Sequence, residues 1–249
     1  MTGRVRWRRA LHAADQFLFP RICAACEGML DDSEAGVVCG RCWARLAVLP
    51  APRCDRCGHP CARRAGCAGC ALLPAYVRSA RSLCWVPDPV SSAILGALKY
   101  RGWPAVADVV GARLAQLVFP EDVVRERAAL VPVPLAPVRL RERGYNQAAR
   151  VAEAVAPRWG VPVWPALARR RATVTQTRLT PGERLANVRA AFAVAETHAD
   201  AVRGRHLILV DDVLTTGATL NACAEALFGA GARTLSYLTF GRARTLADR

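Results

Sequence analysis

The sequence has 249 residues, enough for one large domain or two small ones. Hydrophobic residues make up 53% and charged residues 22% of it, a composition typical of globular proteins and not of disordered chains. Lysine and arginine total 35 against 20 acidic residues, which gives a formal net charge of +15, and Lys99 is the only lysine. Because such an arginine bias matches a GC-rich coding bias, the charge alone does not identify a nucleic-acid partner.

The N-terminal residues 1–22 predict a short amphipathic helix, because apolar side chains recur there at helical spacing. Their basic start is not followed by the apolar stretch and cleavage site of a signal peptide. No uncharged apolar stretch of the sequence reaches the roughly 20 residues that a membrane-spanning helix needs. We therefore expect a cytoplasmic protein without a transmembrane segment.

Eight of the eleven cysteines form four CxxC pairs within residues 23–73. Each pair places two sulfur atoms on one tight turn, and two such turns supply the four ligands of a tetrahedral metal. The segment therefore predicts a double zinc ribbon with about two structural zinc ions, whose binding supplies folding free energy to a short, loop-rich segment. The expected ligands are Cys23, Cys26, Cys39, Cys42, Cys54, Cys57, Cys67 and Cys70.

The spacing leaves the pairing of these turns open. Pairing in sequence order, with the first two turns at one ion and the last two at the other, is the simpler assignment. A cross-braced arrangement is the alternative, and His59 or Cys61 could replace one of the ligands. Cysteines that bind no metal are the remaining interpretation.

Residues 74–249 alternate between patterns typical of strands and of helices, which favours an α/β domain with a parallel sheet flanked by helices. The expected strands cover residues 79–86, 129–133, 191–195, 206–210 and 234–240. The expected helices cover residues 90–100, 104–118, 145–156 and 217–229. The segment 168–190 has no clear period, and a long irregular segment in such a domain is usually functional or mobile.

The most informative segment is 206–219, where an apolar strand is followed by Asp211, Asp212 and a turn of threonine and glycine that opens a helix. The free N–H groups at the start of a helix, together with the hydroxyls, form a site for an anion. Ligands of open α/β sheets bind at this edge. Paired carboxylates would repel a bare phosphate, so hydroxyls or a phosphate-bound Mg²⁺ are their expected partners. A ribose 5-phosphate satisfies both features.

Residues 207–219 closely resemble the phosphoribosyl-pyrophosphate (PRPP) binding motif of type I phosphoribosyltransferases. The resemblance implies that Asp211 and Asp212 are the catalytic pair and contact the ribose hydroxyls, with Mg²⁺ bound to PRPP. It also implies a 5′-phosphate site made by Thr215, Thr216, Gly217, Ala218 and Thr219.

Together with the CxxC pairs, the segments 98–102 and 131–148 make the chain similar to the ComF family of competence-associated, phosphoribosyltransferase-like proteins, from about residue 17 to 241. The resemblance places a pyrophosphate-binding turn at 135–146 and a mobile hood at 170–189. It adds five PRPP-binding candidates, which are Lys99, Arg143, Tyr145, Asn146 and Arg178. Each also has a structural interpretation, as a solvated side chain, a core residue or a helix cap.

Two functions follow from the resemblance. The first is a phosphoribosyltransferase, a glycosyltransferase for an unidentified acceptor, in which the basic segment 137–190 stabilises pyrophosphate. The alternative is a catalytically silent domain of the same fold that binds single-stranded DNA, with Trp103, Tyr145 and Trp159 for base stacking. ComF proteins are linked to DNA uptake and natural transformation, so DNA-uptake and recombination proteins are the expected partners.

Overall fold

The computed structural model describes residues 21–31, 34, 36–61, 67–100, 103–169 and 191–244. The helix predicted over 1–22 lies outside these residues except for its last two, and the hood predicted over 170–189, with Arg178, lies outside them entirely. Ile22 pairs with Met29 in an antiparallel bridge, so it belongs to the first cysteine-rich segment.

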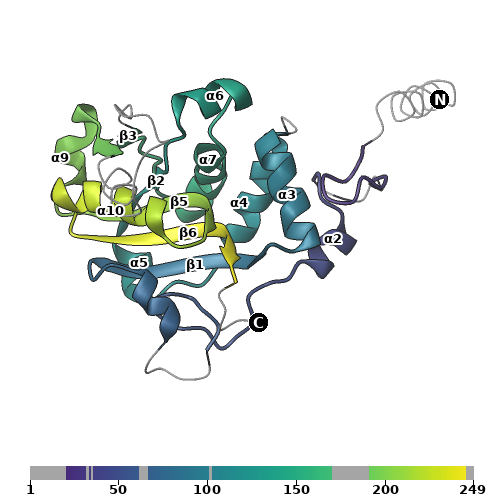
Figure 1. Cartoon of the computed structure of the whole chain (residues 1–249), viewed down its shortest axis with the longest axis horizontal. Helices are drawn as coiled ribbons and strands as arrows, with labels where there is room; N and C mark the ends of the chain where they lie inside the picture. The colour runs from purple at the N-terminus through teal and green to yellow at the C-terminus, as the bar shows by residue number, and fades with distance from the viewer. Residues whose placement is uncertain are drawn as a thin grey trace, which may run out of the picture.

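A four-stranded parallel sheet in the order β1-β6-β5-β2 forms the centre of the molecule (Figure 1). Its strands are β1 (Val77–Val86), β2 (Arg127–Pro132), β5 (His206–Leu214) and β6 (Thr234–Ala243). Nearly all side chains of β1 and β6 are buried, as expected for parallel strands covered on both faces. The predicted parallel α/β sheet is confirmed.

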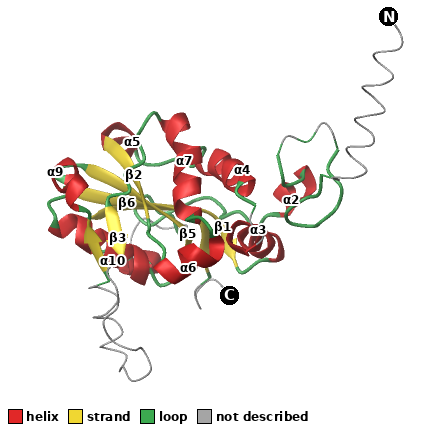
Figure 2. Ribbon diagram, turned by 90° about the horizontal axis from the view of Figure 1, so that it is seen from above, coloured by secondary structure: helices red, strands yellow, loops and turns green. Residues whose placement is uncertain are grey.

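Helices cover the sheet from two sides (Figure 2). Successive side chains of β5 point to opposite faces, so Ile208 and Val210 join one core while Leu207 and Leu209 join the other. Three helices pack on the first core: α3 (Pro89–Tyr100), α4 (Ala105–Leu114) and α7 (Gln147–Trp159). The second core is covered by α10 (Ala218–Gly229).

Shorter elements complete the described part of the chain. They are α2 (Gly40–Arg45), η1 (Ala68–Leu72), α5 (Glu121–Glu126), α6 (Pro137–Arg143), β3 (Leu167–Arg169), β4 (Phe192–Val194), η3 (Glu196–His198) and α9 (Ala199–Val202). Strands β3 and β4 form a separate antiparallel pair. Among the described helices, none has the length and apolar character needed to cross a membrane.

The chain reverses its path across the sheet between β2 and β5. After β2 it passes through α7 and returns outside β2, where Val163 bridges Leu130 in parallel. After β5 it passes through α10 to β6, on the other side of β5. Since ligands bind at the carboxyl ends of the strands that flank such a reversal, the ends of β2 and β5 form the expected binding edge.

Some predicted boundaries are wrong. The helix predicted over 104–118 ends at Leu114, and the helix predicted over 145–156 begins at Gln147 because the Asn146 side chain caps it, accepting from the Ala148 N–H at 3.0 Å. That helix continues for a further turn and ends before a left-handed glycine. The turn predicted over 135–146 contains the short helix α6.

Candidate functional site

The eight cysteines of the CxxC pairs form two groups of four, and all sulfur atoms of a group lie within 4.8 Å of one another. The first cluster contains Cys23, Cys26, Cys39 and Cys42, and the second cluster contains Cys54, Cys57, Cys67 and Cys70. The structure therefore pairs the CxxC turns in sequence order, and the cross-braced alternative is wrong. His59 and Cys61 belong to neither cluster, and the ring of His59 packs edge-on against Trp85.

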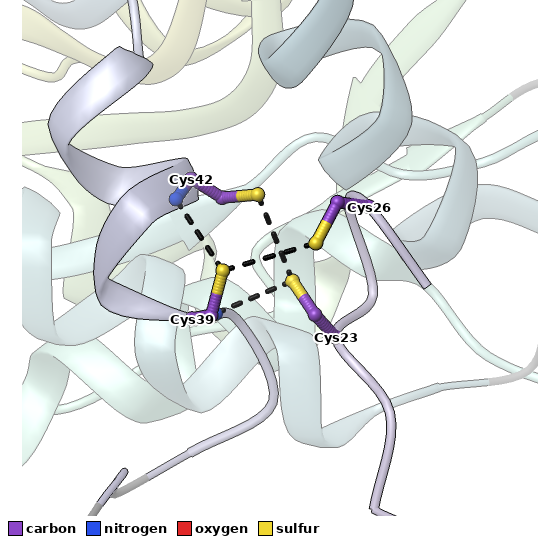
Figure 3. Close-up of side chains that lie close together, drawn as sticks. All are labelled: Cys23, Cys26, Cys39 and Cys42. Carbon is purple, nitrogen blue, oxygen red and sulfur yellow. Dashed lines mark hydrogen bonds between the residues drawn. The ribbon is translucent and has the colours of Figure 1, made fainter. Parts of the chain in front are cut away.

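Both clusters have the dimensions of a zinc site. Thiolates placed at about 2.3 Å around a tetrahedral Zn²⁺ are about 3.8 Å from one another. Two sulfur pairs of the first cluster are 3.8 Å apart (Figure 3), and two pairs of the second are 3.4 and 3.5 Å apart. In the first cluster the sulfur of Cys23 also accepts two backbone hydrogen bonds, from the Cys39 N–H at 3.3 Å and from the Ala25 N–H at 3.4 Å. The donor set therefore fits two structural zinc ions.

Buried arginines fix the second cluster to the sheet. Arg242 of β6 is 2% exposed, and its Nη1 donates to the carbonyl oxygen of Cys57 at 2.7 Å. Arg81 of β1 donates to the carbonyl oxygen of Asp55 at 3.0 Å. At Gly58, a Cβ would lie 2.4 Å from a backbone oxygen of β1. This ribbon is therefore part of the packing of the sheet edge and not a separate module.

The predicted strand, bend and helix over 206–229 are confirmed, since β5 ends at Leu214 and α10 begins at Ala218. We call residues 215–219 the phosphate loop. The residue at the N-cap of α10 is Gly217, whose φ of +79° favours glycine. Its backbone geometry explains why the bend contains a glycine at this position.

Hydroxyl groups surround the start of α10. The side chains of Thr215, Thr216 and Thr219 are exposed, and Thr216 Oγ1 accepts from the Ala218 N–H at 3.4 Å. The helix has 12 residues, long enough for its dipole to favour negative charge at its first turn. The loop can therefore hold an anion with N–H groups and hydroxyls.

The two acidic residues lie directly before this loop. Asp212 Oδ2 is 2.7 Å from Lys99 Nζ of α3 and accepts from Gln147 Nε2 of α7 at 3.0 Å. Gln147 Oε1 in turn accepts from Arg143 Nη1 at 2.9 Å. Three elements that are distant in sequence thus meet at one carboxylate, which α3 neutralises and α7 orients.

Asp211 has a different environment. Burial raises the pKa of this carboxyl well above its usual range, and the adjacent negative charge of Asp212 raises it further. Its Oδ1 accepts from the Asp212 backbone N–H at 2.8 Å, which lowers the pKa in part. The adjacent acids therefore differ, since Asp212 has a cationic partner and the pKa of Asp211 is raised.

The structure brings several predicted residues to this edge in roles that the sequence left open. Lys99 pairs with Asp212 and Arg143 binds Gln147, while Tyr145 donates its hydroxyl to the carbonyl oxygen of Leu98. Asn146 caps α7, and its Nδ2 donates to the carbonyl oxygen that follows β2, at 2.9 Å. These contacts assemble the site from β2, α3 and α7. Arg178 lies outside the described residues.

The stacking residues predicted for the DNA-binding alternative are occupied in packing. Trp159 Nε1 donates to the carbonyl oxygen of Ala115 at 3.0 Å, Phe119 packs edge-on against its ring, and Arg127 lies over it at 4.3 Å. Trp103 packs against the first core. Tyr100, which directly follows the Asp212 partner Lys99, is an exposed aromatic residue with 71% of its surface accessible. Because Trp159 is only partly buried, its availability for stacking stays a prediction.

Sequence reasoning missed two residues of the site. Gln147 lies in the segment 131–148 that carries the resemblance but is not among the predicted site residues, although it is 3% exposed and orients Asp212. Asn221 in the first turn of α10 received no role, although its Nδ2 donates to Leu72 O at 2.8 Å. A polar residue on the inward face of a helix next to a binding motif is the signal that could have found both.

Comparison with known families agrees with this architecture. Residues 14–71 match the double zinc ribbon domain, and residues 145–245 match the phosphoribosyl transferase domain. The second match contains the acid pair, the phosphate loop and the whole of α10.

Curated relatives cover most of the chain. The DNA utilization protein YhgH of Salmonella typhimurium is 30% identical over 226 residues, which are 87% of this chain and 94% of that protein. The competence protein ComFC of Bacillus subtilis is 27% identical over 199 residues, 78% of this chain and 79% of that protein. Competence protein F of Haemophilus influenzae is 33% identical over 132 residues, 53% of this chain and 54% of that protein.

Proposed function

The chain belongs to the ComF family, and on that premise we propose that it binds PRPP together with Mg²⁺ at the phosphate loop. The observation that carries this proposal is the order of groups at the end of β5, where an acid pair is followed by an exposed hydroxyl-rich bend and the start of a 12-residue helix. A sugar that carries both hydroxyls and a phosphate matches this order.

In the proposed complex the phosphate loop binds the 5′-phosphate, and the acids bind the ribose hydroxyls. Both contacts that the described residues make with the Asp212 carboxylate fall on Oδ2, which leaves Oδ1 for a ribose hydroxyl. Asp211 and Asp212 also supply oxygen donors of the kind that Mg²⁺ prefers. Bound Mg²⁺ would neutralise part of the charge of the pyrophosphate group.

We further propose that the domain is a phosphoribosyltransferase. A nucleophile of the acceptor would form a bond to C1 of the ribose while the bond from C1 to the pyrophosphate oxygen breaks, and pyrophosphate would leave with Mg²⁺. The chain would contribute positioning and a positive environment, which Lys99 and Arg143 supply at this edge.

Thermal unfolding tests the binding proposal. We expect Mg-PRPP at 100 times its Kd to stabilise the folded state by about 2.7 kcal/mol, which for a chain of this size raises Tm by roughly 5–10 °C. Asp212→Asn should abolish the shift, whereas Glu153→Gln, an exposed change on α7, should retain it. An unchanged Tm of the unaltered protein at millimolar Mg-PRPP would contradict the proposal. Pyrophosphate release with a panel of nucleobases and amines then tests turnover.

A second candidate function is single-stranded DNA binding, favoured by the exposed Arg139 and Arg141 on α6, the helix that also carries Arg143. The names of the relatives refer to DNA utilization and competence, which supports a place in DNA uptake. Contacts with DNA-uptake and recombination proteins are part of the same proposal. Fluorescence anisotropy with a labelled oligonucleotide tests it. Replacing Arg139 and Arg141 by alanine should reduce the salt slope by about 1.4, roughly 0.7 per lost phosphate contact. An unchanged slope rejects this surface.

A further inference from the structure

We propose that the second cysteine cluster positions the phosphate loop through Asn221, so that metal binding at this cluster and ligand binding at the loop favour each other. The identity of the ligand rests on the proposed function, whereas the contact between the ribbon and the loop does not. Asn221 is a positioning residue in this proposal, because it acts on the loop and not on the ligand.

A short path of contacts joins the cluster to the loop. Cys67 is the N-cap of η1, and Cys70 lies within it, so two of the four sulfurs are held by this one turn. The same turn ends at Leu72, whose carbonyl oxygen accepts from Asn221 Nδ2 at 2.8 Å. Only one residue separates the last sulfur ligand from the carbonyl that contacts α10.

Asn221 is held at both ends of its side chain. Its Oδ1 accepts from the hydroxyl of Tyr237 on β6 at 2.9 Å, and its backbone N–H donates to the carbonyl oxygen of Gly217 at 2.7 Å. The side-chain amide therefore ties the ribbon to the sheet, while the backbone N–H of the same residue binds the glycine of the phosphate loop. Because both ends of the amide are satisfied, displacement of Leu72 would leave a donor without its partner.

The packing at Gly217 shows how closely the ribbon approaches the loop. A Cβ on this residue would lie 3.2 Å from Asn221 Nδ2 and 3.3 Å from Leu72 O. The same carbonyl that anchors Asn221 thus also limits the space of the bend. The ribbon forms part of the wall against which the phosphate loop is built.

A second contact runs through β6. Arg242 is the register partner of Leu214, the last residue of β5 before the phosphate loop, and it donates to the carbonyl oxygen of Cys57. The guanidinium is also 2.9 Å from the position of a Cβ on Gly69, which lies between the ligands Cys67 and Cys70. Both turns of the second cluster are therefore in contact with elements that end at the site.

The first cluster provides an internal control with the same ligands. Three of its cysteines, Cys23, Cys39 and Cys42, pack in the core that contains α3, α4 and α7, whereas Cys57 packs in the core that contains α10. Loss of metal from the first cluster should therefore leave the loop in place. Coupling between two sites is reciprocal, so ligand on the loop should strengthen metal binding at the second cluster alone.

Hydrogen exchange measured by mass spectrometry tests the contact without any ligand. In the zinc-loaded protein, Asn221→Ala and the nearly isosteric Asn221→Asp, which loses the donor, should retain both zinc ions. Each should accelerate amide exchange in residues 214–222 by about fivefold, the factor that matches a typical net hydrogen bond. Tyr237→Phe, which keeps the donation to Leu72, should have a smaller effect. Unchanged exchange in both Asn221 variants would overturn the proposal.

Zinc release to a chromogenic chelator tests the coupling. With Mg-PRPP present, we expect at least fivefold slower release of one of the two ions from the unaltered protein and no slowing in Asn221→Ala. Cys39→Ser removes a ligand of the first cluster only. The slowly released ion should therefore still be present in this variant, which assigns it to the second cluster. Equal slowing in both proteins would contradict the role of Asn221. If Mg-PRPP does not bind the unaltered protein, the proposed function fails, and the exchange experiment still decides the role of Asn221.

Discussion

Each of the two cysteine clusters has four cysteine ligands, and the clusters are nearly the same size, but they are attached to the rest of the molecule differently. The first packs three of its four cysteines and its apolar side chains in the core that contains α3 and α4, and Arg113 of α4 lies over the ring of Trp43 at 4.9 Å. The second is joined to β1, β6 and α10 by directional hydrogen bonds from Arg81, Arg242 and Asn221. In Figure 1, α2 of the first ribbon lies beyond α3, away from α10.

The difference shows that a shared ligand set does not imply a shared role. Apolar packing is non-directional, so the first ribbon can shift without misplacing a particular group. Hydrogen bonds from buried side chains fix positions, so the second ribbon determines where the phosphate loop lies. We therefore expect changes at the second ribbon to affect both stability and ligand binding, and changes at the first to affect stability alone.

The largest effect is expected for Arg242→Met. The change removes the donor to Cys57 O and leaves that buried carbonyl without its partner, which should lower the free energy of unfolding by about 2–3 kcal/mol. Chemical denaturation measures this loss, and chelator assays should show faster zinc release from the second cluster only. If the loss of stability is below 0.5 kcal/mol, the second ribbon is not anchored as we describe.

Gly217→Ala should have the next largest effect, and Gly160→Ala is its matched control. Both glycines have positive φ, so each change should cost about 1 kcal/mol of stability. Only at Gly217 would the new Cβ also press on Asn221 and Leu72, so Mg-PRPP affinity should fall by at least tenfold there and stay unchanged in the control. Equal affinities in the two variants would show that the ribbon does not limit the loop.

Asp211→Asn should change stability in the opposite direction from the ribbon variants. Because the pKa of Asp211 is raised in the folded state, the unfolded chain loses this proton first as pH rises, and stability falls from about pH 4 upward until the folded group also ionises. The neutral side-chain amide introduced by Asp211→Asn removes this loss of stability, and its oxygen can still accept from the Asp212 N–H. Calorimetry at pH 7 should show Tm higher by about 2–4 °C for each kcal/mol regained, with no difference near pH 3. A lower Tm at pH 7 would contradict this assignment.

The smallest effect is expected for Arg113→Ala at the first ribbon. Loss of the contact with the Trp43 ring should cost about 0.5–1 kcal/mol. Titration with Mg-PRPP should give the same Kd as the unaltered protein. A Kd changed by more than threefold would remove the contrast between the ribbons.

Local patterns predicted the parts of this molecule that are local in sequence. The four CxxC turns predicted two cysteine clusters, and the segment from Leu207 to Thr219 predicted the strand, the bend and the helix. In these cases the residues that carry the chemistry are close enough along the chain for spacing to determine their geometry.

The contacts that were missed join distant segments. Lys99 meets Asp212, and Asn221 meets Leu72, only because the strand order brings α3 and η1 to the end of β5. Spacing along the chain contains no information on such pairs. The packing of Trp159 could not be predicted for the same reason, because its indole contacts residues that are far from it in sequence.

Calorimetric titration of Mg-PRPP into the zinc-loaded protein tests the central claim most directly. The account predicts saturable binding of one PRPP per chain that disappears in Asp212→Asn and that weakens at least fivefold in Asn221→Ala, with zinc content unchanged in both. Equal binding in all three proteins, or none in the unaltered one, would contradict it.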